Sequence, residues 1–433
     1  MTNDSAVKSC AKLGCYFIPG LSSSDCIVYL PAAKATFKIR TSDVHFIVEA
    51  ASAYLSKKEC DAKLYTLFEK SHFSLARMRM QSELSGMESI LYISPTSRCN
   101  FKCAYCYSMS GRSTKDIDVS LAKEAVEAFI QTRNISINSV RIVFIGGGEP
   151  LLNFSAVTQL TSFARLCAAR RKMNIIVGVI TNGSLLNDKI ISWFDKEHVR
   201  LNISFEILPD EQTRSRGNFI DVMNAIKLLQ SYSTVCSHTL IRSTLTESNV
   251  NKQLEMLRYA KMSMPWISKY SVEPVTDASF LSDYTTATSF LSTFRQEYEK
   301  AKDFASRAEF KLSTSFDSHV GRFIDHACAG QFGLTPYGAI TSCGCMTSPH
   351  EPYYRDTLLK DTVDDFVGFF HSNHKRTCPL TQHCESCYAR YCCAGGCFIQ
   401  NKLYDMNVKK AICETQKEFL RRFLIKTTYR ELS

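Results

Sequence analysis

The feature of this 433-residue chain that most constrains its fold is an alternation of short apolar runs with helical patterns between residues 90 and 302. Such runs predict buried strands, and the intervening segments predict helices. Strands are predicted at Ile90–Ile93, Val140–Ile145, Ile175–Ile180, Arg200–Ile207, Val235–Ile241 and Tyr270–Val275. Helices are predicted at Leu121–Thr132, Ser155–Arg171, Ile220–Gln230, Val250–Lys261 and Phe290–Phe304. This order predicts an α/β fold with a parallel sheet, and six units are too few for an eight-fold barrel, so we expect an open or partial one.

Polar and glycine-rich segments stand at the ends of the predicted strands, where folds of this class bind ligands. Gly146-Gly147-Gly148-Glu149-Pro150 follows the second strand, and Thr181-Asn182-Gly183 follows the third. Glycines let a backbone approach a ligand closely, and Glu149 suits a cationic amine. Ser204 and Glu206 share one face of their strand, and Arg242 ends the fifth strand, where a guanidinium suits a carboxylate. Each signal alone is typical of an ordinary turn or a solvated side chain, but their recurrence at equivalent places favours a ligand site.

Three cysteines follow the first predicted strand, in the segment Cys99-Asn100-Phe101-Lys102-Cys103-Ala104-Tyr105-Cys106. Four thiolates would close a zinc site or complete an iron–sulfur cluster. Three thiolates leave one iron of a four-iron cluster open to a small ligand, which makes a reaction site. The alternative is a structural zinc knuckle that takes its fourth ligand from a distant part of the chain.

A second group of cysteines lies in residues 303–433, a region poor in periodic structure apart from a closing helix at Glu414–Leu424. The chain has 19 cysteines and no apolar signal segment near Met1, so metal binding explains them better than disulfides. From Cys384 to Cys397 the spacing C-x2-C-x5-C-x3-C is typical of a metal-held domain, with a zinc ribbon as the alternative to an iron–sulfur site.

Composition narrows the remaining possibilities. With 45% hydrophobic residues the chain has enough apolar material for more than one domain. No apolar stretch approaches the length of a membrane span, so we expect a cytoplasmic protein without a membrane partner. The formal net charge is +10, but the basic residues are dispersed and cluster-bound thiolates would offset part of the excess, so no nucleic-acid partner is expected.

Residues 1–80 predict a small α+β domain. Strands are expected at Tyr16–Gly20, Cys26–Leu30 and Ala35–Ile39, followed by helices at Ser42–Leu55 and Glu59–Phe73. An open sheet edge can accept a peptide as an added strand, so this domain suits peptide docking. The alternative is an N-terminal cap that binds no ligand.

Taken together, these motifs make the chain resemble the radical S-adenosylmethionine (SAM) enzymes that carry a C-terminal SPASM domain. The resemblance rests on Cys99-x3-Cys103-x-Tyr105-Cys106 and on the cysteines from Cys328 to Cys413, and it covers about residues 88–420. It implies a partial (β/α)6 TIM-like barrel over residues 88–304 and a SPASM domain over residues 305–433. Residues 1–80 resemble the winged-helix-like module that recognises precursor peptides in many peptide-modifying members.

The resemblance also implies cofactors and the residues that hold them. Cys99, Cys103 and Cys106 would hold a [4Fe–4S] cluster whose open iron binds SAM, and an electron from it would split SAM to give a 5′-deoxyadenosyl radical that abstracts hydrogen from the substrate. The SAM amine would be met by Gly147, Gly148 and Glu149, its carboxylate by Arg242, its ribose side by Ser204 and Glu206, and its adenine and ribose by Tyr105 and Asn182.

Two auxiliary [4Fe–4S] clusters are implied in the SPASM region. The second would take Cys384, Cys387, Cys393 and Cys413, and the first would take Cys328, Cys343 and Cys397. No further cysteine stands shortly after Cys328, so the fourth ligand of the first cluster would be Cys345 or Cys378, or one iron stays open. Gly344 stands where sulfatase-maturing relatives place an acidic residue, which disfavours that activity.

The function implied is that of a peptide maturase. It would bind a ribosomally made precursor peptide, partly through residues 1–80, and form a carbon–carbon or carbon–heteroatom crosslink, with a flavodoxin or ferredoxin as electron donor. Crosslinking is a two-electron oxidation, which two auxiliary clusters suit. The alternatives are formylglycine formation in a sulfatase, peptide epimerisation, RNA modification, and a non-catalytic binding protein whose C-terminal region is held together by zinc.

Overall fold

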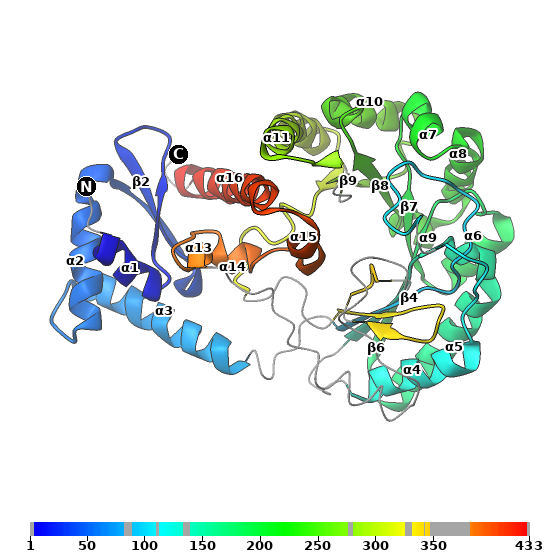
Figure 1. The fold of residues 1–433 in the computed structure, drawn as a ribbon, viewed down its shortest axis with the longest axis horizontal. Helices are drawn as coiled ribbons and strands as arrows, with labels where there is room; N and C mark the ends of the chain where they lie inside the picture. Colours follow the sequence, from blue (N-terminus) through cyan, green and yellow to red (C-terminus); the bar gives the residue numbers. More distant parts are fainter. Residues whose placement is uncertain are drawn as a thin grey trace. The chain divides into compact units, whose positions relative to one another are not determined.

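The fold is that of a computed structural model, which describes residues 4–81, 89–109, 112–132, 139–275, 280–324, 331–341, 343–346 and 382–430. The chain forms two compact units (Figure 1). The larger unit comprises residues 86–314 and 329–376, and the smaller comprises residues 1–85, 315–328 and 377–433. The smaller unit is therefore built from both ends of the chain. In the described residues, no helix is long and apolar enough to cross a membrane.

A nine-stranded sheet organises the larger unit. Its strands are β4 (Ser89–Ile93), β5 (Ser139–Phe144), β6 (Asn174–Thr181), β7 (Arg200–Ser204), β8 (Leu240–Leu245), β9 (Lys269–Pro274), β10 (Lys311–Ser313), β11 (Gln331–Leu334) and β12 (Ile340–Thr341). They lie in the order β10-β9-β8-β7-β6-β5-β4-β11-β12, and every pairing is parallel except that of β11 with β12. The predicted α/β fold with a parallel sheet is confirmed.

Helices alternate with these strands and lie along one face of the sheet (Figure 1). They are α4 (Val119–Gln131), α5 (Phe154–Arg170), α6 (Asp188–Lys196), α7 (Pro209–Ser215), α8 (Phe219–Leu228), α9 (Ser233–Ser237), α10 (Gln253–Ser263) and α11 (Tyr284–Arg307). Side-chain caps fix where several of them begin: Asp118 accepts from two backbone N–H groups of α4, and Asn153, Asn187 and Asp283 cap α5, α6 and α11 in the same way. Each capped helix follows a strand, so its cap also fixes the residue at which the loop after that strand ends.

Burial alternates along strands β5, β7 and β8. In β5, Val140, Ile142 and Phe144 are buried, and the residues between them are half-buried. Because successive side chains of a strand point to opposite faces, one face of the sheet is fully covered and the other is only partly covered. Ser204 of β7 and Arg242 of β8 lie on the less covered face, whereas Glu149, Asn182 and Glu206 are buried beyond the strand ends.

The sequence-based strand limits were wrong at two functionally relevant places. The predicted strand Arg200–Ile207 ends at Ser204, so Glu206 lies beyond β7 and does not share a strand face with Ser204. Val235 lies in helix α9, and the fifth strand is Leu240–Leu245 rather than 235–241, so Arg242 is the third residue of β8 and does not end it. The apolar residues of the short helix α9 resemble those of a strand, and periodicity alone does not separate the two. Strands β10, β11 and β12 also come from residues 303–433, where no strands were predicted.

The smaller unit is built around a three-stranded antiparallel sheet of β1 (Tyr16–Pro19), β2 (Asp25–Leu30) and β3 (Ala35–Arg40), in that order. Its helices are α1 (Asp4–Lys12), α2 (Val44–Leu55), α3 (Ala62–Gln81), α13 (Gln382–Glu385), α14 (Arg390–Cys393), α15 (Phe398–Leu403) and α16 (Met406–Arg430). The three predicted N-terminal strands are confirmed, whereas α1 was not predicted. The closing helix α16 extends beyond the predicted limits at both ends.

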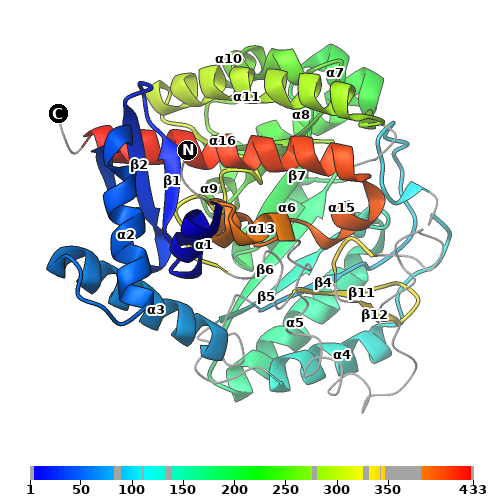
Figure 2. The same ribbon diagram turned by 60° about the vertical axis from the view of Figure 1, so that its left-hand side comes forward.

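Both faces of this small sheet are buried (Figure 2). Val28 and Leu30 of β2 belong to one apolar cluster with residues of α1, α2 and α3. Ile27 and Tyr29 point the other way, into a second cluster with residues of α14 and α16. The N-terminal sheet therefore shares a core with the cysteine-rich C-terminal segment, a contact between distant parts of the sequence that the local patterns did not predict.

Candidate active site at the carboxyl ends of the parallel strands

The cysteine loop, defined as residues 99–106, follows β4 at the carboxyl edge of the large sheet. Cys103 is buried, and Cys99 and Cys106 are half-buried. The loop is held in place by its backbone, because the Ala104 N–H donates to the Ser215 carbonyl at 2.9 Å and the Cys106 N–H donates to the Cys103 carbonyl at 3.2 Å. The three thiols predicted to act together thus belong to one anchored loop.

The three thiols influence one another electrostatically. Burial raises the pKa of the Cys99 and Cys103 thiols, and a neighbouring thiol raises each further. Two guanidinium groups face the loop: Arg112 Nη2 donates to Cys106 Sγ at 3.3 Å, and Arg216 Nη1 donates to Cys103 Sγ at 3.8 Å. A bound metal group would stabilise the thiolates that burial disfavours, and the two cations favour the same charged forms. The donor set therefore fits an iron–sulfur cluster.

The described residues contain no three His, Cys, Asp or Glu side chains gathered around a point that would suit a single metal ion.

The glycine turn after β5 lies directly against the start of the cysteine loop. The Gly147 N–H donates to Ser94 Oγ at 3.0 Å, and the Glu149 N–H donates to the Arg98 carbonyl at 2.7 Å. A Cβ atom on Gly148 would lie 2.0 Å from the Arg98 carbonyl oxygen, and one on Gly146 would lie 1.5 Å from the Gly148 carbonyl oxygen. Only glycine permits this close approach of two backbones.

Glu149 is 2% exposed, and its carboxylate is engaged by protein donors. Oε1 accepts from Thr181 Oγ1 at 2.6 Å and from the Leu151 N–H at 3.1 Å, and Oε2 accepts from the Asn182 N–H at 2.8 Å. Burial raises the pKa of Glu149 to about 7, although these three donors oppose the shift. The side chain therefore ties the end of β5 to the end of β6, and its contact with a ligand amine stays a prediction.

Asn182 links the end of β6 to the cysteine loop. Its Nδ2 donates to Asn100 Oδ1 at 2.9 Å, and its Oδ1 accepts from the backbone and hydroxyl of Ser184. Gly183 follows with φ at 82°, a conformation that favours glycine. The three segments predicted from the sequence to face one ligand, after β4, β5 and β6, are thus joined by direct hydrogen bonds.

A buried ionic network stands beside the loop, and its centre is Glu206. The Glu206 carboxylate is fully buried and accepts from Tyr105 OH, from Arg216 Nε at 2.6 Å, and from the hydroxyl of Ser243 and the N–H of Thr244 at 2.6 and 3.0 Å. The Arg216 guanidinium lies 5.1 Å from the centre of the Tyr105 ring and also donates to Thr244 Oγ1 at 3.2 Å. Burial and the nearby carboxylate raise the pKa of Tyr105 well above its ordinary value.

This network changes what is expected of two predicted SAM contacts. Tyr105 and Glu206 were predicted to meet the adenine and ribose, but their polar atoms already have protein partners, so any such contact would have to compete with them. Arg216 was missed by the sequence analysis. It follows the short helix α7 in a stretch without periodic pattern, and no local signal marks it as a partner of a strand end 10 residues earlier.

Ser204 and Arg242 lie side by side on neighbouring strands, since Ser204 of β7 pairs in register with Arg242 of β8, which pairs with Ser271 of β9. Arg242 is exposed, and its side chain makes no hydrogen bond or ion pair with any residue that the structure describes. The contact of the Arg242 guanidinium with a ligand carboxylate stays a prediction, now from the middle of its strand.

The auxiliary cysteines are divided between the two units. Cys384, Cys387, Cys393, Cys397 and Cys413 lie in the smaller unit, and Cys343 and Cys345 lie in the larger one. Burial raises the pKa of Cys393, and thiols that include Cys413, Cys387 and Cys384 raise it further, so the four cysteines predicted to hold the second auxiliary cluster are neighbours. Cys328 and Cys378 lie outside the described residues.

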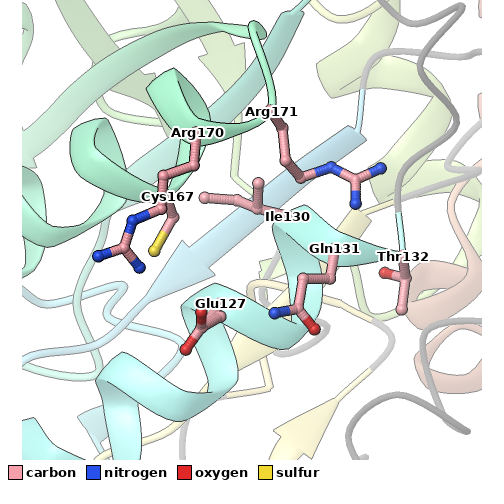
Figure 3. Close-up of a pocket in the computed structure, with 7 residues that line it drawn as sticks. All are labelled: Glu127, Ile130, Gln131, Thr132, Cys167, Arg170 and Arg171. Carbon is pink, nitrogen blue, oxygen red and sulfur yellow. The ribbon is translucent and has the colours of Figure 1, made fainter.

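A pocket of about 490 Å³ lies elsewhere, between the last turns of α4 and α5 (Figure 3). Glu127, Cys167, Arg170 and Arg171 line it. Both helices end where β5 and β6 begin, so this pocket is at the amino edge of the sheet, opposite the cysteine loop. The chemistry of the loop, and not this cavity, identifies the candidate active site.

The curated relatives of this chain match it over part of its length. The uncharacterized protein MJ0907 of Methanocaldococcus jannaschii is 26% identical over 181 residues, which are 41% of this chain and 59% of that protein. The radical SAM cyclopropyl synthase TigE of Paramaledivibacter caminithermalis is 20% identical over 366 residues, 76% of this chain and 72% of TigE. A GTP 3′,8-cyclase of Clostridium botulinum is 26% identical over 163 residues, 37% of this chain and 48% of the cyclase.

Solved structures share the fold over more of the chain. The structure of anSMEcpe with bound AdoMet has a TM-score of 0.63 and 17% identity, covering 78% of this chain and 98% of that one. Streptococcus suis SuiB bound to precursor peptide SuiA has a TM-score of 0.54 and 15% identity, covering 91% of this chain and 97% of that one. At such identities the likeness shows a common fold.

Residues 93–257 match the Radical SAM superfamily. This range contains the cysteine loop, the glycine turn, Asn182, the Glu206 network and Arg242. The match implies SAM and a [4Fe–4S] cluster as cofactors. The segment from residue 93 to residue 257 is therefore a Radical SAM superfamily segment within this chain.

Proposed function

We propose that this chain is a radical SAM maturase that binds a ribosomally made precursor peptide and closes a carbon–carbon or carbon–heteroatom crosslink within it. The observation that carries the proposal is the likeness to SuiB over 91% of the chain, since that share is too large to come from the parallel sheet and its helices alone. SuiB was solved bound to its precursor peptide SuiA, and anSMEcpe was solved with the Cp18Cys peptide as well as AdoMet.

In this proposal Cys99, Cys103 and Cys106 hold the [4Fe–4S] cluster, and SAM lies over the glycine turn at the carboxyl ends of β5 to β8. When bound, the cluster would supply the electron for cleaving SAM, and the cleaved cofactor would supply the means of removing hydrogen from the peptide. Gly147 and Gly148 bring backbone close to the SAM amine, Arg242 holds its carboxylate, and Ser204 lies beside it. Glu149 and Asn182 keep the three loops in register.

The domain division expected from the sequence is kept in the proposal: a recognition domain at residues 1–80, a radical SAM partial barrel at 88–304 and a SPASM domain at 305–433. Strand β3 supports peptide docking, because among the described strands it pairs with β2 alone, which leaves its outer edge without a strand partner. The neighbouring thiols of Cys384, Cys387, Cys393 and Cys413 support an auxiliary cluster. A cluster there suits a reaction that removes two electrons from the peptide.

The sulfatase-maturing alternative meets a steric obstacle. Gly344 stands where that activity places an acidic residue, and a Cβ atom at this position would lie 2.4 Å from the ring of Tyr92. An acidic side chain there would require the ring to move. The proposed reaction needs no carboxylate at residue 344.

The experiment that tests the proposal is mass spectrometry of a short peptide encoded beside the gene. The peptide is incubated without oxygen in deuterated water with reconstituted enzyme, reductant and SAM. Loss of two hydrogens, with fragmentation blocked across a few residues, is the expected result. An unchanged hydrogen count with one stable deuteron would show epimerisation and refute crosslinking. An unchanged peptide with SAM still cleaved would refute the peptide substrate and direct attention to a protein substrate.

A further inference from the structure

We propose that Arg112 raises the reduction potential of the cluster held by Cys99, Cys103 and Cys106, and that Arg216, although it also contacts the loop, contributes less because Glu206 neutralises it. The inference rests on the proposed cluster. It concerns how easily that cluster accepts its electron, which neither the family match nor the structural likeness addresses.

Arg112 is placed to act on the cluster with its full positive charge. Its Nη2 donates to Cys106 Sγ at 3.3 Å, and its Nη1 donates to the Phe101 carbonyl, so two contacts with the cysteine loop fix the orientation of the guanidinium. The side chain is half-buried, and its Nε is buried without a hydrogen-bond partner. Among the described residues no carboxylate forms an ion pair with it. The thiols of the cysteine loop are therefore the nearest groups that can carry a negative charge to balance the Arg112 guanidinium.

Arg216 makes the contrasting case. Its Nη1 lies 3.8 Å from Cys103 Sγ, but its Nε is 2.6 Å from Glu206 Oε1, and the side chains are 10% and 0% exposed. At a distance the pair acts as a dipole rather than as a charge, so its field at the cluster falls off faster than that of Arg112. The structure gives Arg216 a different task, which is to hold Tyr105 and the end of β7 together.

Reduction adds one negative charge to a cluster that its thiolates already make anionic. A nearby cation, and a hydrogen bond to a ligating sulfur, stabilise the reduced form more than the oxidised form and so raise the potential. Arg112 supplies both. A neutral side chain at residue 112 would therefore make the cluster harder to reduce, while lysine would keep the charge and lose the two-pronged geometry.

The test is a redox titration of the full-length reconstituted enzyme, followed by electron paramagnetic resonance. The signal that changes on addition of SAM reports the cluster with the open iron and separates it from auxiliary clusters. Wild type is compared with Arg112→Gln, with the charge-conserving Arg112→Lys, and with Arg170→Gln. Arg170 is the matched control, because it is an exposed arginine at the amino edge of the sheet. Iron content and thermal unfolding establish that each variant is folded and loaded.

We expect Arg112→Gln to lower the ratio of reduced to oxidised cluster at a fixed potential by about tenfold, or about 59 mV for a one-electron couple. Arg112→Lys should recover most of the wild-type potential, and Arg170→Gln should match wild type. An unshifted potential in Arg112→Gln, or an equal fall in Arg112→Lys, would overturn the electrostatic role. A wild-type protein without any SAM-sensitive signal would overturn the proposed cluster itself, so the two failures are distinguishable.

Discussion

The close approach of the glycine turn to the cysteine loop yields the sharpest prediction, the effect of Gly148→Ala. The new Cβ would lie 2.0 Å from the Arg98 carbonyl oxygen and 2.7 Å from the carbonyl carbons of Ser97 and Arg98. All three are backbone atoms, which cannot rotate away as a side chain can. Real Cβ atoms keep at least 3.0 Å from such neighbours, so the two segments would have to separate by about 1 Å.

Two costs follow from that separation. Overpacking of a closely fitted site costs about 1–3 kcal/mol. The hydrogen bond from the Glu149 N–H to the Arg98 carbonyl, now 2.7 Å long, would stretch or break and cost about 1 kcal/mol more. We therefore expect Gly148→Ala to lower the free energy of unfolding by about 3 kcal/mol. Because the turn is the surface on which SAM is proposed to lie, SAM affinity should fall as well.

Gly178→Ala is the matched control, in strand β6 of the same sheet. Its Cβ would meet the Arg200 carbonyl oxygen at 3.5 Å and Val143 Cγ2 at 3.8 Å, which are ordinary contacts. The change should be within about 1 kcal/mol of wild type, because the loss of chain freedom in the unfolded state favours alanine. Anaerobic denaturant unfolding and equilibrium dialysis with SAM measure both quantities. Equal stability and equal SAM affinity of the two variants would refute the reasoning.

Three further predictions concern buried groups. Burial raises the pKa of Glu149 from 4.5 to about 7, so the folded state binds this proton more tightly than the unfolded state does. The stability that the bound proton provides, roughly 3 kcal/mol, is fully present below pH 4.5 and is lost as the pH rises to about 7. Glu149→Gln should flatten this pH dependence of the free energy of unfolding, measured between about pH 5 and about pH 8. Arg216→Met leaves the Glu206 carboxylate buried without its counter-ion and should cost about 3–5 kcal/mol, with a smaller loss in Arg216→Lys; equal melting temperatures for the two variants would contradict the ion-pair argument. Leu420→Ala removes a fully buried side chain between α16 and the N-terminal sheet and should cost about 2–5 kcal/mol in denaturant unfolding, whereas Met406→Ala, at a residue 61% exposed on the same helix, should cost little.

The parallel sheet was predictable because its strands are apolar runs bounded by turn residues, and β4, β5 and β6 appear where those runs stand. The fifth strand was misplaced, because Val235 is the one buried residue of a short helix whose composition resembles that of a strand. Strands β10, β11 and β12, at the two ends of the sheet order, are two to four residues long, too short for any period to appear in the sequence. Their places depend on pairing with strands distant in sequence.

The candidate site was predictable to the extent that its residues lie in dense local motifs. The cysteine loop, the glycine turn and Asn182 were all found from spacing, and the structure joins them by hydrogen bonds. The partners of Glu206 and the placement of Arg112 and Arg216 were not predictable, because a single arginine in an aperiodic stretch carries no local signal. Their roles depend on which strand end the fold brings beside them.

The central claim, that the cysteine loop holds the cluster that cleaves SAM, is tested most directly by measuring 5′-deoxyadenosine formation without oxygen. Wild type is compared with a variant in which Cys99, Cys103 and Cys106 are all replaced by alanine, and iron is counted in both. We predict that wild type produces 5′-deoxyadenosine and that the variant does not, while the variant retains the iron bound by the auxiliary cysteines. Production at the wild-type rate by the variant would contradict the account.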